Sequence, residues 1–317
     1  MAAATVVPVT ILLAGGAPAR LSLPVVWESA VARWLVFAGL SVALGGLAGR
    51  GLARQYQGRF PAPLSAPLPA PWALRGSVAG AAGSAWLVLI ALSGAGLVTG
   101  LARAPRLFST TPGAIAGVEL ISFAVAALLL RLRQPRWSVL PLAVVVLAEG
   151  LRAHPEAIIP VVGALITYCH LLPAVLWAGM LLYILRAAIA WRDYPEQMRG
   201  LMRLYAAAAA WLFALLVITG VISALVLVPL GSLLTTAYGR VLLVKATLVL
   251  VAGCLAVAGR VWLRQRPGPG AGPGLATRLE CGTLAVVLAV TALLTALTPP
   301  AHPVRPAAAV QQHLAGR

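Results

Sequence analysis

The sequence has few charged residues and few aromatic ones. Charged residues make up 10% and aromatic residues 6% of the 317 positions, whereas a soluble domain carries about 25% charged residues. This shortage excludes a soluble globular enzyme, a disordered chain and a nucleic-acid-binding domain. The apolar fraction is 61% and the mean hydropathy +0.95, and the excess consists of Ala, Leu, Val and Gly, which let membrane helices pack closely. The composition therefore predicts a multi-span membrane protein.

Cysteine is also scarce. Cys169, Cys254 and Cys281 each lie within an apolar segment, and no two of them have CxxC spacing. An odd number of cysteines in such positions predicts neither a disulfide framework nor a zinc site.

Apolar segments recur along the whole chain. A helix that crosses a bilayer needs roughly 20 mainly apolar residues, and the pattern predicts an all-α polytopic protein with about eight transmembrane helices in one bundle. We expect them near 30–52, 77–102, 113–132, 138–153, 157–188, 204–229, 238–262 and 278–298. Stretches rich in proline and glycine, at 60–71, 111–113 and 266–273, are typical of loops. The chain then divides into a lead-in (1–28), a four-helix membrane region (29–155), a second membrane domain (156–300) and a tail (301–317).

The basic residues predict the orientation. Placing both termini outside puts 15 arginines on the cytoplasmic side and eight on the opposite side, and Lys245 lies inside a span. The net charge of +17 is thus explained by topology, and no nucleic-acid partner is expected. Residues 1–19 carry no charge, so they could be a signal, a ninth span or an external segment. We interpret them as an interfacial or external lead-in, because a cleavable signal usually begins with basic residues.

Ionisable residues inside a membrane are costly and are candidates for function. At ~1.5 Å per helical residue, the predicted spans place three of them in the outer half, one near the middle and one near the cytoplasm: Glu119, Glu149 and Lys245, then His170, then Glu280. They could form a polar ladder across the membrane. Alternatively, Lys245 neutralises Glu149 or Glu119 as an ion pair, and Glu280 only reaches the interface beside Arg278.

The surroundings of His170 point to copper. Cys169 precedes it and Met180 follows on the same predicted helix, and imidazole, thiolate and thioether groups all suit copper. Glu149 and His154 fall near the outer mouth of the fourth span, where they could collect a cation first. The plainer alternative is that His170 is a hydrogen-bonded packing residue.

The C-terminal half resembles the copper resistance protein D (CopD/PcoD) family of bacterial inner-membrane proteins. The strings that carry this resemblance run over 170–180, 218–220, 236–245, 278–280 and 294–300, and the likeness covers roughly 160–300, so that the second membrane domain is expected to be CopD-like. By this resemblance the family's signature positions are His170, Trp177, Tyr238, Lys245 and Glu280. The histidine at 154 stands about one helical turn from the place where family members commonly carry one.

The resemblance implies a plasma-membrane protein that moves copper from outside toward the cytoplasm, with copper as substrate. It also implies a separate external copper-binding partner of the CopC type, alongside the lipid bilayer itself. We expect an uptake permease driven by gradients and not an enzyme, because the chain has no nucleotide-binding loop. Two alternatives remain: a copper relay or sensor that does not transport, and a haem protein of the cytochrome b kind, which usually needs two facing histidines.

Overall fold

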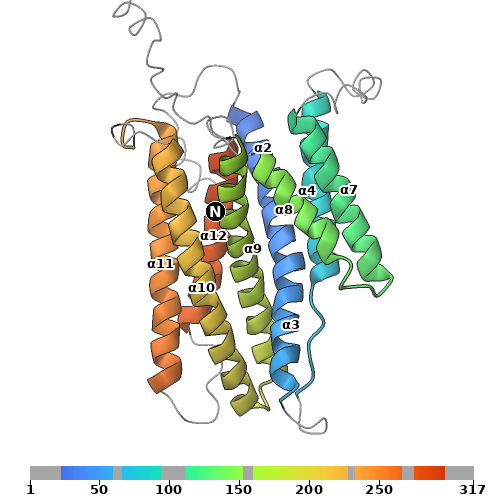
Figure 1. Ribbon diagram of the computed structural model, residues 1–317, viewed down its shortest axis with the longest axis vertical. Coiled ribbons are helices and arrows are strands. Elements are labelled where there is room, and N and C mark those ends of the chain that lie inside the picture. Colours follow the sequence, from blue (N-terminus) through green and yellow to red (C-terminus); the bar gives the residue numbers. More distant parts are fainter. Residues whose placement is uncertain are drawn as a thin grey trace, which may run out of the picture.

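The computed structural model describes residues 23–59, 66–93, 111–152, 160–227, 231, 233–265 and 275–296, and over these residues its regular secondary structure is all helix, without a strand. The first helix is continuous: α2 (Leu23–Leu40) passes through a short π-helix, η1 (Ser41–Gly45), into α3 (Gly46–Gln57). The others are α4 (Ala73–Ser93), α7 (Thr111–Arg131), α8 (Val139–Arg152), α9 (Pro160–Ala190), α10 (Pro195–Leu227), α11 (Ala237–Gln265) and α12 (Leu275–Ala296) (Figure 1). The prediction of an all-α fold is confirmed.

Seven helices of the described chain are long and apolar enough to cross a membrane. The eighth, α8, has 14 residues and is therefore ~21 Å long, shorter than the ~30 Å hydrocarbon core. The expectation of about eight spans is met by seven full-length helices and this shorter one. The chain is a multi-pass membrane protein, and the placement of both termini outside stays a prediction.

The helices lie side by side, with α9 in the middle of the bundle (Figure 1). On one side α2 packs against α4, and α4 packs against α7. On the other side α11 packs against α12, while α9 contacts α10, α8 and the first helix. The bundle is thus one unit in which α9 joins the earlier helices to the later ones.

Glycine allows the closest of these crossings. Gly45 in η1 faces Gly179 in α9, and a Cβ atom on Gly45 would stand only 2.6 Å from the Cα of Gly179. Larger residues here would push the two helices apart, as expected where small residues let membrane helices approach closely.

Two of the predicted loops lie at least partly within the described residues, and only one of them is confirmed. Residues 66–71, the described part of the proline-rich stretch, form no helix, and their carbonyls at Pro67 and Pro69 accept hydrogen bonds from Trp191 and Tyr183 of α9. The loop predicted at 111–113 is wrong, because these residues form the first turn of α7. A proline is tolerated there, since the first backbone N–H groups of a helix have no partner within it.

Candidate functional site

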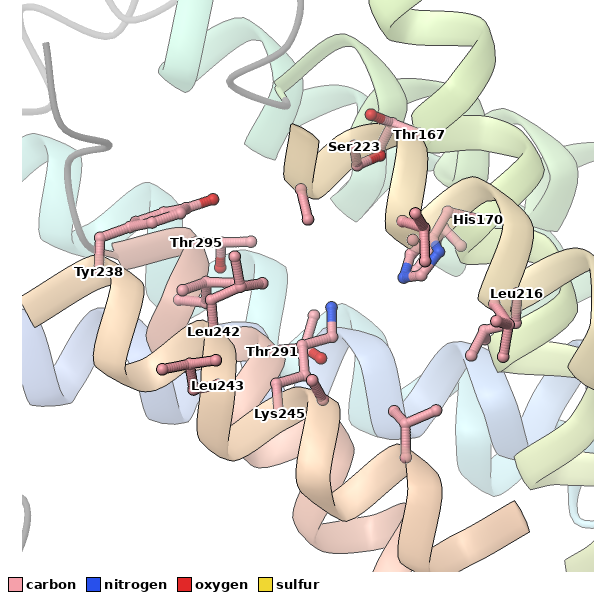
Figure 2. Close-up of a pocket in the computed structure, with 18 of the residues that line it drawn as sticks. Thr167, His170, Leu216, Ser223, Tyr238, Leu242, Leu243, Lys245, Thr291 and Thr295 are labelled. Carbon is pink, nitrogen blue, oxygen red and sulfur yellow. The ribbon is translucent and has the colours of Figure 1, made fainter. Parts of the chain in front are cut away.

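A cavity of about 520 Å³ lies mainly between α10 and α11, with α9, α12, α2 and α8 contributing to its wall (Figure 2). Most of its lining is Leu, Val and Ala. The polar side chains on the wall are Arg33, Glu149, Arg152, Thr167, His170, Ser223, Tyr238, Lys245, Thr291 and Thr295. An apolar cavity of this size with a few polar groups is the usual form of a binding site for a small ligand.

His170 extends from α9 into this cavity (Figure 2), and its ring is oriented by α10. Its Nδ1 lies 3.1 Å from Thr219 Oγ1, and the Thr219 hydroxyl donates to the carbonyl of Leu215 at 2.7 Å. Because a hydroxyl has one proton, Thr219 accepts from Nδ1–H, and the Nε2 of a neutral ring keeps its lone pair. A ring that donates from one nitrogen and keeps a lone pair on the other is the arrangement of most histidine metal ligands.

Gly220 makes room for this ring. A Cβ atom at Gly220 would stand 3.1 Å from Cε1 of His170, which is closer than ordinary van der Waals contact. Thr219 therefore holds the ring by a hydrogen bond, and Gly220 leaves the space that the ring occupies.

Lys245 enters the same cavity from α11, on the side facing His170 (Figure 2). Among the described residues no carboxylate forms an ion pair with it. The predicted pairing of Lys245 with Glu149 or Glu119 is therefore wrong.

Both carboxylates instead contact Arg152. Arg152 Nη2 lies 2.7 Å from Glu119 Oε1, and its Nε lies 3.8 Å from Glu149 Oε2. Glu119 and Glu149 are almost fully buried. A second arginine, Arg33, lines the cavity beside this group and donates to the carbonyl of Thr295 at 2.6 Å.

Trp177 and Glu280 form a separate buried contact nearer the other end of α9. The indole Nε1 donates to Glu280 Oε1 at 3.0 Å, and Glu280 is only 3% exposed. Arg278, by contrast, is exposed. The alternative that Glu280 merely reaches the interface beside Arg278 is wrong, because its carboxylate is inside the bundle. Phe213 packs edge-on against the Trp177 ring, with centroids 5.5 Å apart.

The structure does not gather the predicted copper ligands around His170. Cys169 is half-buried and is not part of the cavity wall, and Met180 lies in the core cluster of Trp177, ~15 Å along α9 from His170. Glu149 lines the cavity but contacts Arg152, and His154 lies outside the described residues. Within the described ranges no three His, Cys, Asp or Glu side chains form a cluster that could hold a metal ion.

Of the other predicted positions, Tyr238 and Lys245 belong to the cavity wall, whereas Glu119 lies behind it, bonded to Arg152. Sequence reasoning missed Thr219 as a partner of His170. Arg33 and Arg152 are two of the eight arginines that the topology prediction places on the outer side, although both line the cavity. The signal that could have identified Arg152 is its i,i+3 spacing from Glu149 on one helix.

Over the described residues, seven helices of spanning length and a cavity with polar side chains on its wall define a multi-pass membrane protein with an intramembrane polar site. The family model described as copper resistance protein D (CopD) matches residues 199–297. This match covers just under a third of the chain, so the segment from α10 to α12 is similar to the copper resistance protein D family. Comparisons with curated proteins and with solved structures give no match.

The matched residues supply most of one side of the cavity. They include Gly220 of α10, Tyr238 and Lys245 of α11, and Thr291 of α12. His170, on α9, lies outside the matched residues but is bound by Thr219 within them.

Proposed function

We propose that this protein carries copper across the bacterial inner membrane toward the cytoplasm, with the cavity between α10 and α11 as part of the path. The observation that supports this most is the hydrogen bond between His170 and Thr219. It joins the one histidine of the described residues to the segment matched by the copper resistance protein D family.

The Nε2 lone pair of His170 would be the copper ligand within the membrane. Imidazole binds copper well, and the apolar surroundings exclude competing water. Glu149 and His154 would act at the outer mouth, and a separate external protein of the CopC type would deliver the ion. Copper is the substrate here, and we assign the chain no catalytic reaction.

Transport of this kind would be driven by gradients. An inside-negative membrane potential contributes about 2.3 kcal/mol per charge per 100 mV to the entry of a cation. A copper ion at His170 would also experience repulsion from Lys245 across the cavity, so its residence there should be short, which suits a transport path more than a storage site.

The direct test is copper uptake into proteoliposomes that contain the purified protein, with zinc as the control ion. Wild-type protein is expected to admit copper selectively, and His170→Ala is expected to abolish this flux. Cys254→Ser is the matched control, because Cys254 is exposed and belongs to no part of the cavity wall.

Full copper flux in His170→Ala would contradict the proposed role of the imidazole. Absence of flux in the wild type, with copper still bound at a defined stoichiometry, would favour a relay or sensor. A Soret absorption band in the purified protein would favour the haem alternative.

A further inference from the structure

We propose that the cavity between α10 and α11 binds an amphiphilic carboxylate, with the carboxylate on Lys245 and the apolar tail between the two helices. This inference rests on charge balance and access from the lipid, and it does not depend on copper transport.

The charges around the cavity do not balance. Three cationic side chains line it, namely Arg33, Arg152 and Lys245. The carboxylates nearby are Glu119 and Glu149, and both contact Arg152. Arg33 contacts the carbonyl of Thr295. Lys245 is thus an ammonium group in an apolar cavity without a carboxylate partner among the described residues, and a buried charge of this kind is costly unless it is paired.

The neighbouring hydroxyls are neutral, so they do not replace such a partner, and their protons are already donated within their own helix. The hydroxyl of Thr291 donates to Val287 at 2.8 Å, and that of Thr295 donates to Ala292 at 2.8 Å. On the opposite wall, the Nδ1 side of His170 is bonded to Thr219. The head of a ligand would therefore be bound chiefly by Lys245, which offers donors and a positive charge. These properties of Lys245 favour an anionic ligand.

The rest of the cavity favours an apolar group on the ligand. This group can enter from the membrane. Val221 and Leu225 of α10 and Leu243 and Leu250 of α11 all line the cavity, yet Leu225 is 64% and Leu250 63% exposed. Since these helices face lipid in a membrane, the cavity wall is continuous with the lipid-facing surface. A volume of about 520 Å³ is within the range of about 300–1,000 Å³ that small-molecule sites occupy.

The test uses radiolabelled dodecanoate bound to full-length protein in a nonionic steroid detergent, measured by scintillation proximity. Unlabelled dodecanoate is expected to compete. Acetate has the head without the tail, dodecanol has the tail without the charge, and dodecyltrimethylammonium reverses the charge. Each of these is expected to compete at least tenfold more weakly. Dodecanol and dodecyltrimethylammonium lose the hydrogen bond between two charged groups, which corresponds to about tenfold or more in Kd, and acetate loses the burial of the tail.

Substitution of the lysine gives the second arm. Lys245→Met is expected to weaken dodecanoate binding about tenfold or more, while Lys245→Arg retains it. Thr247→Met is the matched control, because it puts the same side chain on the same helix at an exposed position outside the cavity wall.

Equal competition by dodecanol, or unchanged affinity in Lys245→Met, would overturn the assignment of the head group to Lys245. Equal competition by acetate would overturn the assignment of the tail. If Lys245→Met does not fold, the competition series on wild-type protein decides the question alone. Failure of copper flux would leave these outcomes unchanged, so the two proposals are tested separately.

Discussion

Replacing Arg152 with methionine removes the cation that contacts two buried carboxylates. In the structure Arg152 Nη2 is 2.7 Å from Glu119 Oε1 and its Nε is 3.8 Å from Glu149 Oε2. The side chains of Glu119 and Glu149 are 0% and 3% exposed, and that of Arg152 is 10% exposed. Methionine conserves much of the apolar volume of the arginine stem, so the loss of charge dominates the effect.

The expected loss of stability follows from this burial. Removing one partner of a buried ion pair costs about 3–5 kcal/mol, because the other partner is left charged and unpaired. Arg33 remains on the cavity wall beside the carboxylates and should keep the loss toward the lower value. For a chain of this size we expect a decrease in Tm of roughly 4–8 °C.

The assay is thermal unfolding of the purified protein in detergent, followed by intrinsic fluorescence. Arg152→Met combined with Glu119→Gln and Glu149→Gln is expected to recover most of the lost Tm, because it removes the uncompensated charges. Arg192→Met is the matched control, since the side chain of Arg192 is 81% exposed and its ion pair with Asp193 lies at the surface, where such pairs contribute about 0–1 kcal/mol. A Tm for Arg152→Met equal to that of Arg192→Met would refute the reasoning.

Three further predictions concern α9 and its neighbours. Trp177→Phe should lower stability by about 1.5–3 kcal/mol, because the carboxylate of Glu280 loses its indole donor; thermal unfolding checks this, and no recovery on adding Glu280→Gln would contradict it. Gly179→Val should abolish monodisperse elution in size-exclusion chromatography, because even a Cβ atom there would overlap the backbone of the first helix; an unchanged elution profile would show that the helices can separate freely. Gly220→Ala should reduce copper flux through displacement of the His170 ring while leaving Tm nearly unchanged, and wild-type flux would show that the position of the ring is unimportant.

The sequence predicts the helices well because their length and apolar character are local properties. The span expected at 238–262 is α11, Ala237–Gln265, and the span expected at 157–188 is α9, Pro160–Ala190. A rise of ~1.5 Å per residue also gives relative depth, which correctly separates His170 from Glu280 along the bundle, with Glu280 bonded to Trp177 seven residues further along α9.

Depth alone does not predict the partner of a side chain, since it leaves open the rotation of each helix and the choice of its neighbours. Lys245 and Glu149 have similar predicted depths, yet Glu149 contacts Arg152 on its own helix and Lys245 faces His170 across a cavity. Arginines near helix ends, such as Arg152, look like topological charges until the structure shows that they are buried. The hydrogen bond between Thr219 and His170 could not be predicted either, because a threonine in an apolar span has no spacing that identifies its partner.

The division of the cavity between matched and unmatched residues has a consequence for protein engineering. The family match begins at residue 199, whereas His170, Arg33 and Glu149 precede it and line the same cavity as Lys245. A chimera that exchanges only α10 to α12 with a relative would therefore combine a cavity wall from one parent with an imidazole and a carboxylate from the other. An exchange that preserves the site must therefore include the whole bundle from α2 to α12. The segment matched by the family model contains only part of the residues that form the site.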